Sequence, residues 1–163
     1  MRALAAVLLL TASAQAQDVT LSRDTVEEAF KKAECRTEVG EALANAEPFD
    51  LEKGYRLYAL TCWQSDYQSG SVLFLRDGAG RARPLTFQHW TGKKFEPSLV
   101  LAEVDFVPQS GTLTSFNKGN AQAECGQIGT WHWTGSEFKM TGYWYKERCD
   151  GYQLEGQKRY RIR

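Results

Sequence analysis

The chain of 163 residues lacks a hydrophobic run long enough to cross a lipid bilayer. Its longest apolar run covers residues 3–10, whereas a membrane-spanning helix needs about 20 residues. No cysteine follows the small residues after this run, so the signature of a lipoprotein anchor is missing as well. We therefore expect no membrane anchor of either kind.

An excess of charge of one sign is also missing, because 20 Lys and Arg residues balance 20 Asp and Glu residues. A neutral chain has no long-range field that would steer it onto polyanions. We therefore expect neither nucleic acid nor an anionic lipid surface as a partner.

Residues suited to catalysis or metal binding are scarce. The only histidines are His89 and His132, and no two cysteines form a C-x-x-C pair, the spacing typical of redox motifs and zinc knuckles. No G-x-S-x-G nucleophile elbow is present, and the glycines of residues 111–119 are in the wrong order for a phosphate-binding loop. We expect no catalytic residue, no metal and no cofactor, and we assign both histidines to the strands of hairpins.

The first 16 residues have the features of a secretory signal peptide. Arg2 is followed by the apolar run and then by Ala14-Gln15-Ala16, which fits a small-x-small cleavage site. We expect signal peptidase to remove residues 1–16, which would leave a periplasmic or secreted protein.

The remaining residues, 17–163, have the ordinary size of a single domain. They contain an even number of cysteines, as expected for a chain in an oxidising compartment: Cys35, Cys62, Cys125 and Cys149. We predict two disulfides. Of the three possible connectivities we predict Cys35 with Cys62, which would pin a helix to the first strand, and Cys125 with Cys149, which would close a hairpin unit.

The pattern of apolar residues predicts a mainly β domain with one N-terminal helix. The helix covers residues 22–35, because apolar side chains recur there at spacings of three and four, and residues 39–46 add at most a weaker turn. Later residues are rich in aromatic and β-branched types and are cut at short intervals by turn residues. We predict strands near 55–63, 71–76, 83–90, 95–102, 103–107, 111–116, 128–134, 137–146 and 157–162.

Short connections between these segments favour an antiparallel meander of about eight strands. A repeat supports this, because residues 89–95 (HWTGKKF) recur as residues 132–138 (HWTGSEF). Each copy indicates a hairpin whose glycine adopts a positive φ. The strands could form a two-sheet sandwich or a closed barrel.

Two blocks of the sequence form a distinctive pattern. The first contains residues 60–68 (LTCWQSDYQ) and 71–75 (SVLFL), and the second contains residues 111–119 (GTLTSFNKG), 124–126 (ECG) and 130–135 (TWHWTG). Together with Cys149, these blocks resemble an uncharacterised bacterial envelope family, domain-of-unknown-function family 1176. The resemblance extends over about residues 24–163 and implies an envelope protein without an assigned activity. Family members carry an additional N-terminal half with its own cysteines, so the chain resembles a single-half version.

The five Trp, seven Tyr and eight Phe residues are too many for one buried face. In the predicted strand 137–146, regular alternation would place Phe138, Met140 and Trp144 inside, with Tyr143 and Tyr145 on the outer face. Exposed tyrosines offer flat, amphipathic area to a ligand. We therefore take Tyr143 and Tyr145 as the candidate binding residues.

These features favour a monomeric, non-enzymatic binding module that recognises an envelope protein or a glycan through an aromatic β surface. The first alternative is a periplasmic inhibitor of a lysozyme or a protease, since such inhibitors are also small disulfide-bonded β proteins. The second alternative is an enzyme of unrecognised type.

The signal-peptide interpretation gives a prediction about the mature N-terminus. The exported protein should begin at Gln17, because cleavage follows Ala14-Gln15-Ala16. Intact-mass measurement of the exported product checks this. A product that retains residues 1–16 would contradict it.

Overall fold

A computed structural model describes residues 21–163 of the chain. The expected signal peptide, residues 1–16, and the expected N-terminus at Gln17 lie outside this described part. The described chain is mainly β, as predicted, but it contains two helices where we expected one. Helix α1 covers Arg23–Lys32 and helix α2 covers Val39–Ala44. The second helix forms because Ala42 is buried, which compensates for the low helix propensity of Gly40.

The strands are more numerous than predicted. They are β1 Glu47–Asp50, β2 Arg56–Gln64, β3 Ser69–Arg76, β4 Ala82–Pro84, β5 Phe87–Trp90, β6 Phe95–Ser98, β7 Val100–Ala102, β8 Val104–Val107, β9 Thr112–Lys118, β10 Gly126–Trp133 and β11 Phe138–Lys146. Two 3-10 turns, η1 Glu52–Gly54 and η2 Lys158–Tyr160, complete the described elements.

The strands form two main sheets and a separate hairpin. The N-terminal sheet has the order β1-β2-β3-β4, with β7 also paired to β3, and the C-terminal sheet has the order β11-β10-β9-β8. Strands β5 and β6 pair only with each other, and all pairings are antiparallel. Both sheet orders are open, so the closed-barrel alternative is wrong and the arrangement fits a sandwich.

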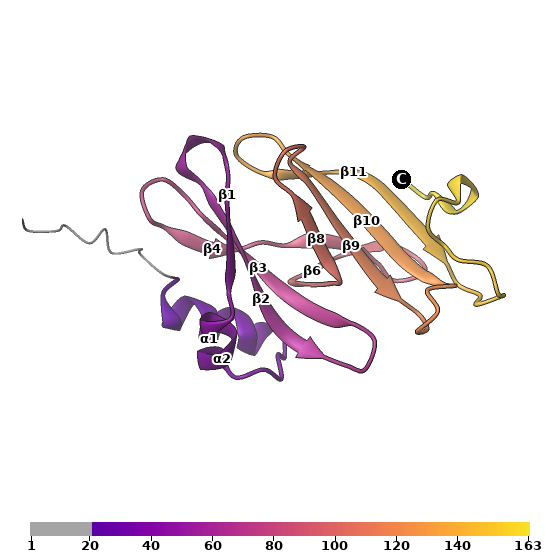
Figure 1. Cartoon of the computed structure of the whole chain (residues 1–163), viewed down its shortest axis with the longest axis horizontal. Coiled ribbons are helices and arrows are strands. Elements are labelled where there is room, and N and C mark those ends of the chain that lie inside the picture. Colours follow the sequence, from indigo (N-terminus) through magenta and orange to yellow (C-terminus); the bar gives the residue numbers. More distant parts are fainter. Residues whose placement is uncertain (1–20) are drawn as a thin grey trace, which may run out of the picture.

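Both faces of the N-terminal sheet are buried, because successive side chains along its strands point alternately into two apolar clusters. Leu57, Leu73 and Leu75 point into an inner core shared with the C-terminal sheet. Their neighbours Tyr58 and Phe74 point into a second core beneath the helices. Figure 1 shows α1 and α2 on the side of this sheet away from β9–β11. The molecule therefore has three layers: the helices, the N-terminal sheet and the C-terminal sheet.

The disulfides join the predicted pairs. Cys35 bonds to Cys62, and Cys125 bonds to Cys149. The first bond fastens the connection between α1 and α2 to β2 at a β-bulge, where Cys62 has no partner in the ladder with β3. The carbonyl of Cys62 is thereby free to accept bonds from the N–H groups of Arg36 and Thr37.

Several predicted strands differ from the structure. Strand β1 was missed because it contains Pro48, which an edge strand tolerates. The predicted strand 83–90 divides between β4 and β5 where the chain leaves the N-terminal sheet, and 95–102 divides between β6 and β7 where it returns. The predicted strand 157–162 is wrong, since it contains η2 and only an isolated bridge between Arg161 and Trp144.

The repeated hairpin is confirmed in both copies. The N–H of Thr91 donates to the carbonyl of Lys94 at 3.0 Å, and the N–H of Thr134 donates to that of Glu137 at 2.9 Å. The glycine that follows each threonine has a left-handed backbone, with φ of 88° at Gly92 and 91° at Gly135. The same sequence thus builds the same turn in β5–β6 and in β10–β11.

A second β-bulge determines which side chains of β11 face the core. Thr130 pairs with Gly142 and Trp131 pairs with Met140, so Thr141 is an extra residue without a partner in the ladder. Regular alternation therefore breaks at Thr141. Met140, before the bulge, and Tyr143, after it, both pack in the inner core. In a regular strand, residues three positions apart would point to opposite faces.

The bulge overturns the expectation that Tyr143 is exposed. Tyr143 is 4% exposed, and its ring packs edge-on against Phe95 with centroids 5.1 Å apart. Its hydroxyl donates to Oε1 of Gln127 at 2.6 Å and accepts from the backbone N–H of Trp90 at 3.2 Å. Burial raises the pKa of the Tyr143 phenol, against the hydrogen bond from Trp90. Tyr143 therefore fastens the β5–β6 hairpin to the C-terminal sheet.

The position of Tyr143 predicts a large stability cost for its removal. Replacing Tyr143 with Ala should lower the free energy of unfolding by about 3–5 kcal/mol. Tyr143→Phe should cost roughly 1–3 kcal/mol because Gln127 and Trp90 lose their partner. The half-buried Tyr145 is the matched control, and Tyr145→Ala should cost about 1 kcal/mol. Urea unfolding measures all three, and equal losses for the two alanine variants would contradict the assignment.

Candidate functional site

The C-terminal segment, residues 147–163, folds back onto the C-terminal sheet. The Cys125–Cys149 disulfide holds its beginning, and Leu154 is fully buried, with its N–H donating to the carbonyl of Ala123 at 3.1 Å. At its end, the N–H of Ile162 donates to the carbonyl of Tyr143 at 2.8 Å. The segment is therefore attached at three separate points along its length.

A buried lysine supplies a further attachment. Lys146, only 3% exposed, donates from Nζ to the carboxylate of Asp150 and to the carbonyl of Tyr152 at 2.6 Å. The ring of Tyr160 lies 5.4 Å from the same nitrogen. The hydrogen bond from Lys146 lowers the pKa of the Asp150 carboxyl below its usual value. A buried ammonium needs such partners, and here they fix the path of the C-terminal segment.

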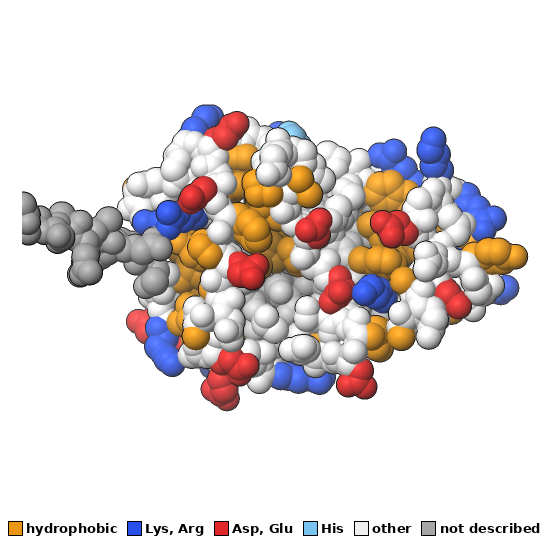
Figure 2. All heavy atoms as spheres, in the orientation of Figure 1, with side chains coloured by type: hydrophobic (Ala, Val, Ile, Leu, Met, Phe, Trp, Pro, Cys, Tyr) orange, Lys and Arg blue, Asp and Glu red, His pale blue; other side chains and the backbone are white. Residues whose placement is uncertain are grey.

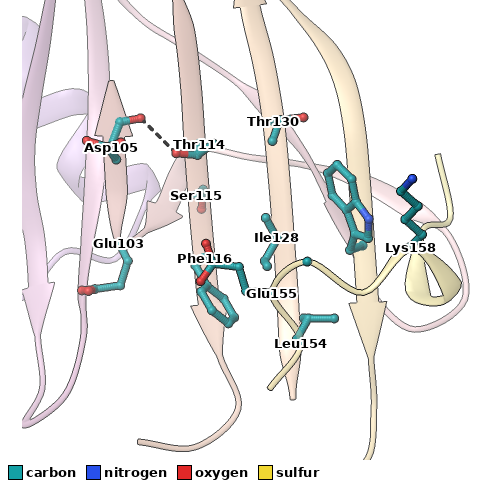
Figure 3. Close-up of a pocket in the computed structure, with 12 residues that line it drawn as sticks. Glu103, Asp105, Thr114, Ser115, Phe116, Ile128, Thr130, Leu154, Glu155 and Lys158 are labelled. Atoms are coloured by element: carbon teal, nitrogen blue, oxygen red, sulfur yellow. Dashed lines mark hydrogen bonds between the residues drawn. The ribbon is translucent and has the colours of Figure 1, made fainter. Parts of the chain in front are cut away.

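Between this segment and the outer face of β8–β11 lies a groove of about 460 Å³, which we call the outer groove. Its floor contains one side chain from each of three neighbouring strands, because Ile128 pairs with Phe116 on one side and with Trp144 on the other. Figure 3 shows Phe116 and Ile128 on adjacent strands with Leu154 beside them. Figure 2 shows hydrophobic side chains gathered over this sheet between acidic and basic ones.

Trp144 is held in the groove by the absence of a side chain at Gly142. A Cβ added to Gly142 would stand 2.5 Å from Cη2 of Trp144, so the indole lies directly over this residue. The guanidinium of Arg161 lies 5.4 Å from the indole centroid, and Nη2 of Arg161 donates to the carbonyl of Thr141 at 2.9 Å. The carbonyl of the bulged residue is thus satisfied by the C-terminal segment, and the same contact orients the indole.

The rim of the outer groove carries charged side chains that no other described residue neutralises. Asp105 comes from β8, and Glu155 and Lys158 come from the C-terminal segment. Within residues 21–163 these three side chains have neither a hydrogen-bond partner nor an ion-pair partner. Figure 3 shows Glu155 directed toward β9, whereas Lys158 lies at the opposite side of the groove. One side of the rim therefore offers hydrogen-bond acceptors and the other a donor.

Glu103 also borders the groove, but its charge is used within the protein. Its carboxylate accepts from the N–H of Ser69 at 2.7 Å and from Nζ of Lys118 at 3.3 Å, and its own N–H donates to the carbonyl of Ser69. Partial burial alone would raise the pKa of Glu103, but these hydrogen bonds outweigh it and lower the pKa. Glu103 thus joins the two sheets, and its own backbone is in the left-handed region, with φ of 42°.

A smaller cavity of about 210 Å³ lies between the sheets and the β5–β6 hairpin. It is lined by His89, Gln127, Tyr143 and other residues of the inner face. Burial lowers the pKa of His89, and the negative charge of Glu96 on the paired strand partly offsets this effect. Gln127 and Tyr143 are already bonded to each other. Unlike the outer groove, this cavity has no Asp, Glu, Lys or Arg among its lining residues.

The structure separates the residues that the sequence suggested as a site. Tyr143 is core, and Tyr145 is half-buried with its ring 6.4 Å from that of Trp90, so the two do not form a shared surface. His132 is exposed on the face of β10 opposite the buried Trp131 and Trp133, as predicted, and it does not line the outer groove.

Sequence analysis missed the residues that do line the groove. Phe116, Ile128 and Trp144 lie far apart in the chain and meet only through strand register. One signal was present, because Gly142-Tyr143-Trp144 repeats the spacing of Gly129-Thr130-Trp131. In both cases the tryptophan lies over the glycine two residues before it.

Two further properties concern the described residues alone. Within residues 21–163, no cluster of three or more His, Cys, Asp or Glu side chains is arranged to hold a metal ion. None of the helices in this part of the chain is long and apolar enough to cross a membrane.

Comparison with known proteins gives one match. A family model described as "Protein of unknown function (DUF1176)" matches residues 2–161. No curated protein and no solved structure matches the chain.

The attachment of the C-terminal segment gives a prediction about the second disulfide. Replacing Cys125 and Cys149 with serine should lower the free energy of unfolding by roughly 3.5 kcal/mol, as expected for a bridge that spans 24 residues. The amide of Leu154 should also lose its slow hydrogen exchange, because its bond to Ala123 depends on the segment staying in place.

The matched control removes the bridge between Cys35 and Cys62, which spans 27 residues. It should cost about the same free energy and leave the Leu154 amide protected. Urea unfolding and native-state hydrogen exchange measure the two effects. Slow exchange at Leu154 in both variants would show that the disulfide does not hold the groove wall.

Proposed function

The chain belongs to the DUF1176 family, and from that premise we propose that it is a non-enzymatic binding module that works outside the cytoplasm. The observation that carries the proposal is the outer groove, with its apolar floor and its unpartnered rim charges. Pockets that bind ligands typically combine apolar walls with a few free polar groups. The two disulfides support an oxidising compartment, in keeping with the expected signal peptide.

We propose binding rather than catalysis because the hydroxyl groups around the groove are already engaged. Oγ of Ser115 donates to the carbonyl of Ala102 at 2.7 Å, and Oγ1 of Thr114 donates to that of Asp105 at 3.3 Å. Oγ1 of Thr130 lies 3.1 Å from Oγ1 of Thr141. Within residues 21–163, none of these hydroxyls is paired with a histidine or carboxylate that would activate it as a nucleophile.

The shape of the site favours a binding module over the inhibitor that the sequence also allowed. An inhibitor would present a protruding loop to the cleft of its enzyme. The outer groove is concave, and it lies on the face of a sheet beneath a segment that is fixed at several points. A concave surface accepts a ligand and does not itself enter a cleft.

The proposal predicts that a single charge in the floor abolishes binding. Ile128→Lys would place an ammonium between Phe116 and Trp144, where an apolar ligand surface is expected to lie. The wild type, immobilised and exposed to an envelope extract, should retain a component that this variant does not retain. Mass spectrometry of the bound protein and glycan fractions measures the difference.

Tyr67→Ala is the control, because Tyr67 is an exposed aromatic residue in the turn between β2 and β3. It should capture the same component as the wild type. All three proteins should show the same cooperative melting. Equal capture by the wild type and Ile128→Lys would contradict the outer groove as the binding site.

A further inference from the structure

We infer that the ligand of the outer groove is a saccharide chain of β-linked pyranose rings, which stacks on Trp144 and hydrogen-bonds to the groove's free rim groups. This inference rests on the proposed function, because it names the chemical class of the ligand for the same site. Four properties of the groove carry it, namely the orientation of the indole, the length of the floor, the polar groups of the rim and the pairing of the floor strands.

The indole of Trp144 is a fixed aromatic surface. Gly142 lies against it on one side, and the guanidinium of Arg161 lies over the ring at 5.4 Å from the centroid, so little conformational freedom remains to be lost when a ligand binds. Trp144 is only partly buried, so a pyranose would stack on the part of the ring that Arg161 leaves uncovered. An aromatic ring in contact with water favours flat partners that have an apolar face, and a β-linked pyranose offers such a face through its axial C–H groups.

The length of the floor fits more than one sugar ring. Phe116, Ile128 and Trp144 occupy three neighbouring strands in register. Adjacent strands lie about 4.8 Å apart, so the row is roughly 10 Å long. Two linked pyranose rings can lie along such a row, and further rings would extend beyond it.

The rim matches the hydrogen-bonding groups of a sugar. The carboxylates of Asp105 and Glu155 have no partners within residues 21–163 and can accept hydrogen bonds from ring hydroxyls. The ammonium of Lys158, on the opposite side, can donate to a hydroxyl or to the carbonyl of an acetamido group. These charges are of mixed sign, so the groove has no strong field to select a polycation or a polyanion.

The pairing of the floor strands disfavours a peptide that binds through its backbone. Such a peptide adds itself to an exposed strand edge, where N–H and C=O groups are free. Strands β9 and β10 are each paired on both sides. The outer edge of β11 beside Trp144 is bonded by residues 161–163 of the C-terminal segment. Recognition must come from side chains, and those present suit hydroxyl groups and apolar ring faces.

The experiment titrates ¹⁵N-labelled protein with chitotetraose and with cellotetraose, which are β-1,4-linked tetramers with and without acetamido groups. We expect at least one tetramer to shift the amide signals of Phe116, Ile128 and Trp144, with little change at the distant turn that contains Tyr67. Trp144→Ala should weaken binding about tenfold or more, as for a central aromatic contact. Tyr67→Ala should leave the affinity unchanged.

Asp105→Asn is a second variant that keeps the exposed side chain nearly isosteric and should not alter folding. It should weaken binding several-fold, because a neutral amide accepts weaker hydrogen bonds than a carboxylate does. Lys158→Met should weaken chitotetraose more than cellotetraose if Lys158 donates to the acetamido carbonyl. Equal effects would assign Lys158 to a hydroxyl and keep the saccharide.

Failure of the saccharide inference and failure of the binding proposal give different results. If neither tetramer shifts the groove amides while a trilysine peptide does, the saccharide is overturned and the groove remains a binding site. If neither tetramer acts but the Ile128→Lys variant loses a captured protein, the same conclusion follows. If neither tetramer acts and capture does not depend on Ile128, both proposals are overturned.

Discussion

The extra residue Thr141 in β11 is the constraint on which the C-terminal half of the structure depends. Because Thr141 has no partner in the ladder, the side chains that follow it exchange faces relative to a regular strand. Tyr143 enters the core and bonds the β5–β6 hairpin through Trp90. Trp144 faces outward and becomes part of the groove floor. One unpaired residue thus determines both a core contact and a candidate binding surface.

The bulge also ties the C-terminal segment to the sheet. A bulged residue leaves a carbonyl without a ladder partner, and Arg161 supplies one for Thr141 while its guanidinium borders the indole of Trp144. Cys62 shows the same arrangement in the other sheet, where Arg36 and Thr37 bond its freed carbonyl. In each case a bulged residue becomes the attachment point for a distant part of the chain. That part also carries a disulfide cysteine, Cys35 for the N-terminal sheet and Cys149 for the C-terminal sheet.

Features that follow from local pattern could be predicted from the sequence. The burial of Val26, Ala29 and Phe30 follows from helical spacing, and the opposite faces of His132 and its flanking tryptophans follow from strand alternation. The turn glycines follow from the repeat. Each of these features depends on residues within a few positions of each other, which is the range over which periodicity is informative.

The remaining features depend on contacts between distant residues. Gly142 is the one local sign of a bulge beside Thr141, because a glycine inside a strand often marks one. Regular alternation ignores it and assigned Tyr143 and Trp144 to the wrong faces. Arg159, Tyr160 and Arg161 alternate as in a strand, yet they lie in a segment whose path is fixed by Lys146 and by the second disulfide. The floor of the groove needs the register of three strands, and its wall needs that segment, so the site could not be found from motifs.

The measurement that tests this arrangement most directly is a set of nuclear Overhauser contacts for the two neighbouring aromatic residues of β11. We expect the ring protons of Tyr143 to show contacts with Phe95 and Trp131, since the centroids lie 5.1 and 6.5 Å apart. The indole protons of Trp144 should show contacts with Gly142 and Arg161. Contacts between Trp144 and Trp131, together with a Tyr143 ring that shows none to Phe95, would contradict the bulge and the outer groove built on it.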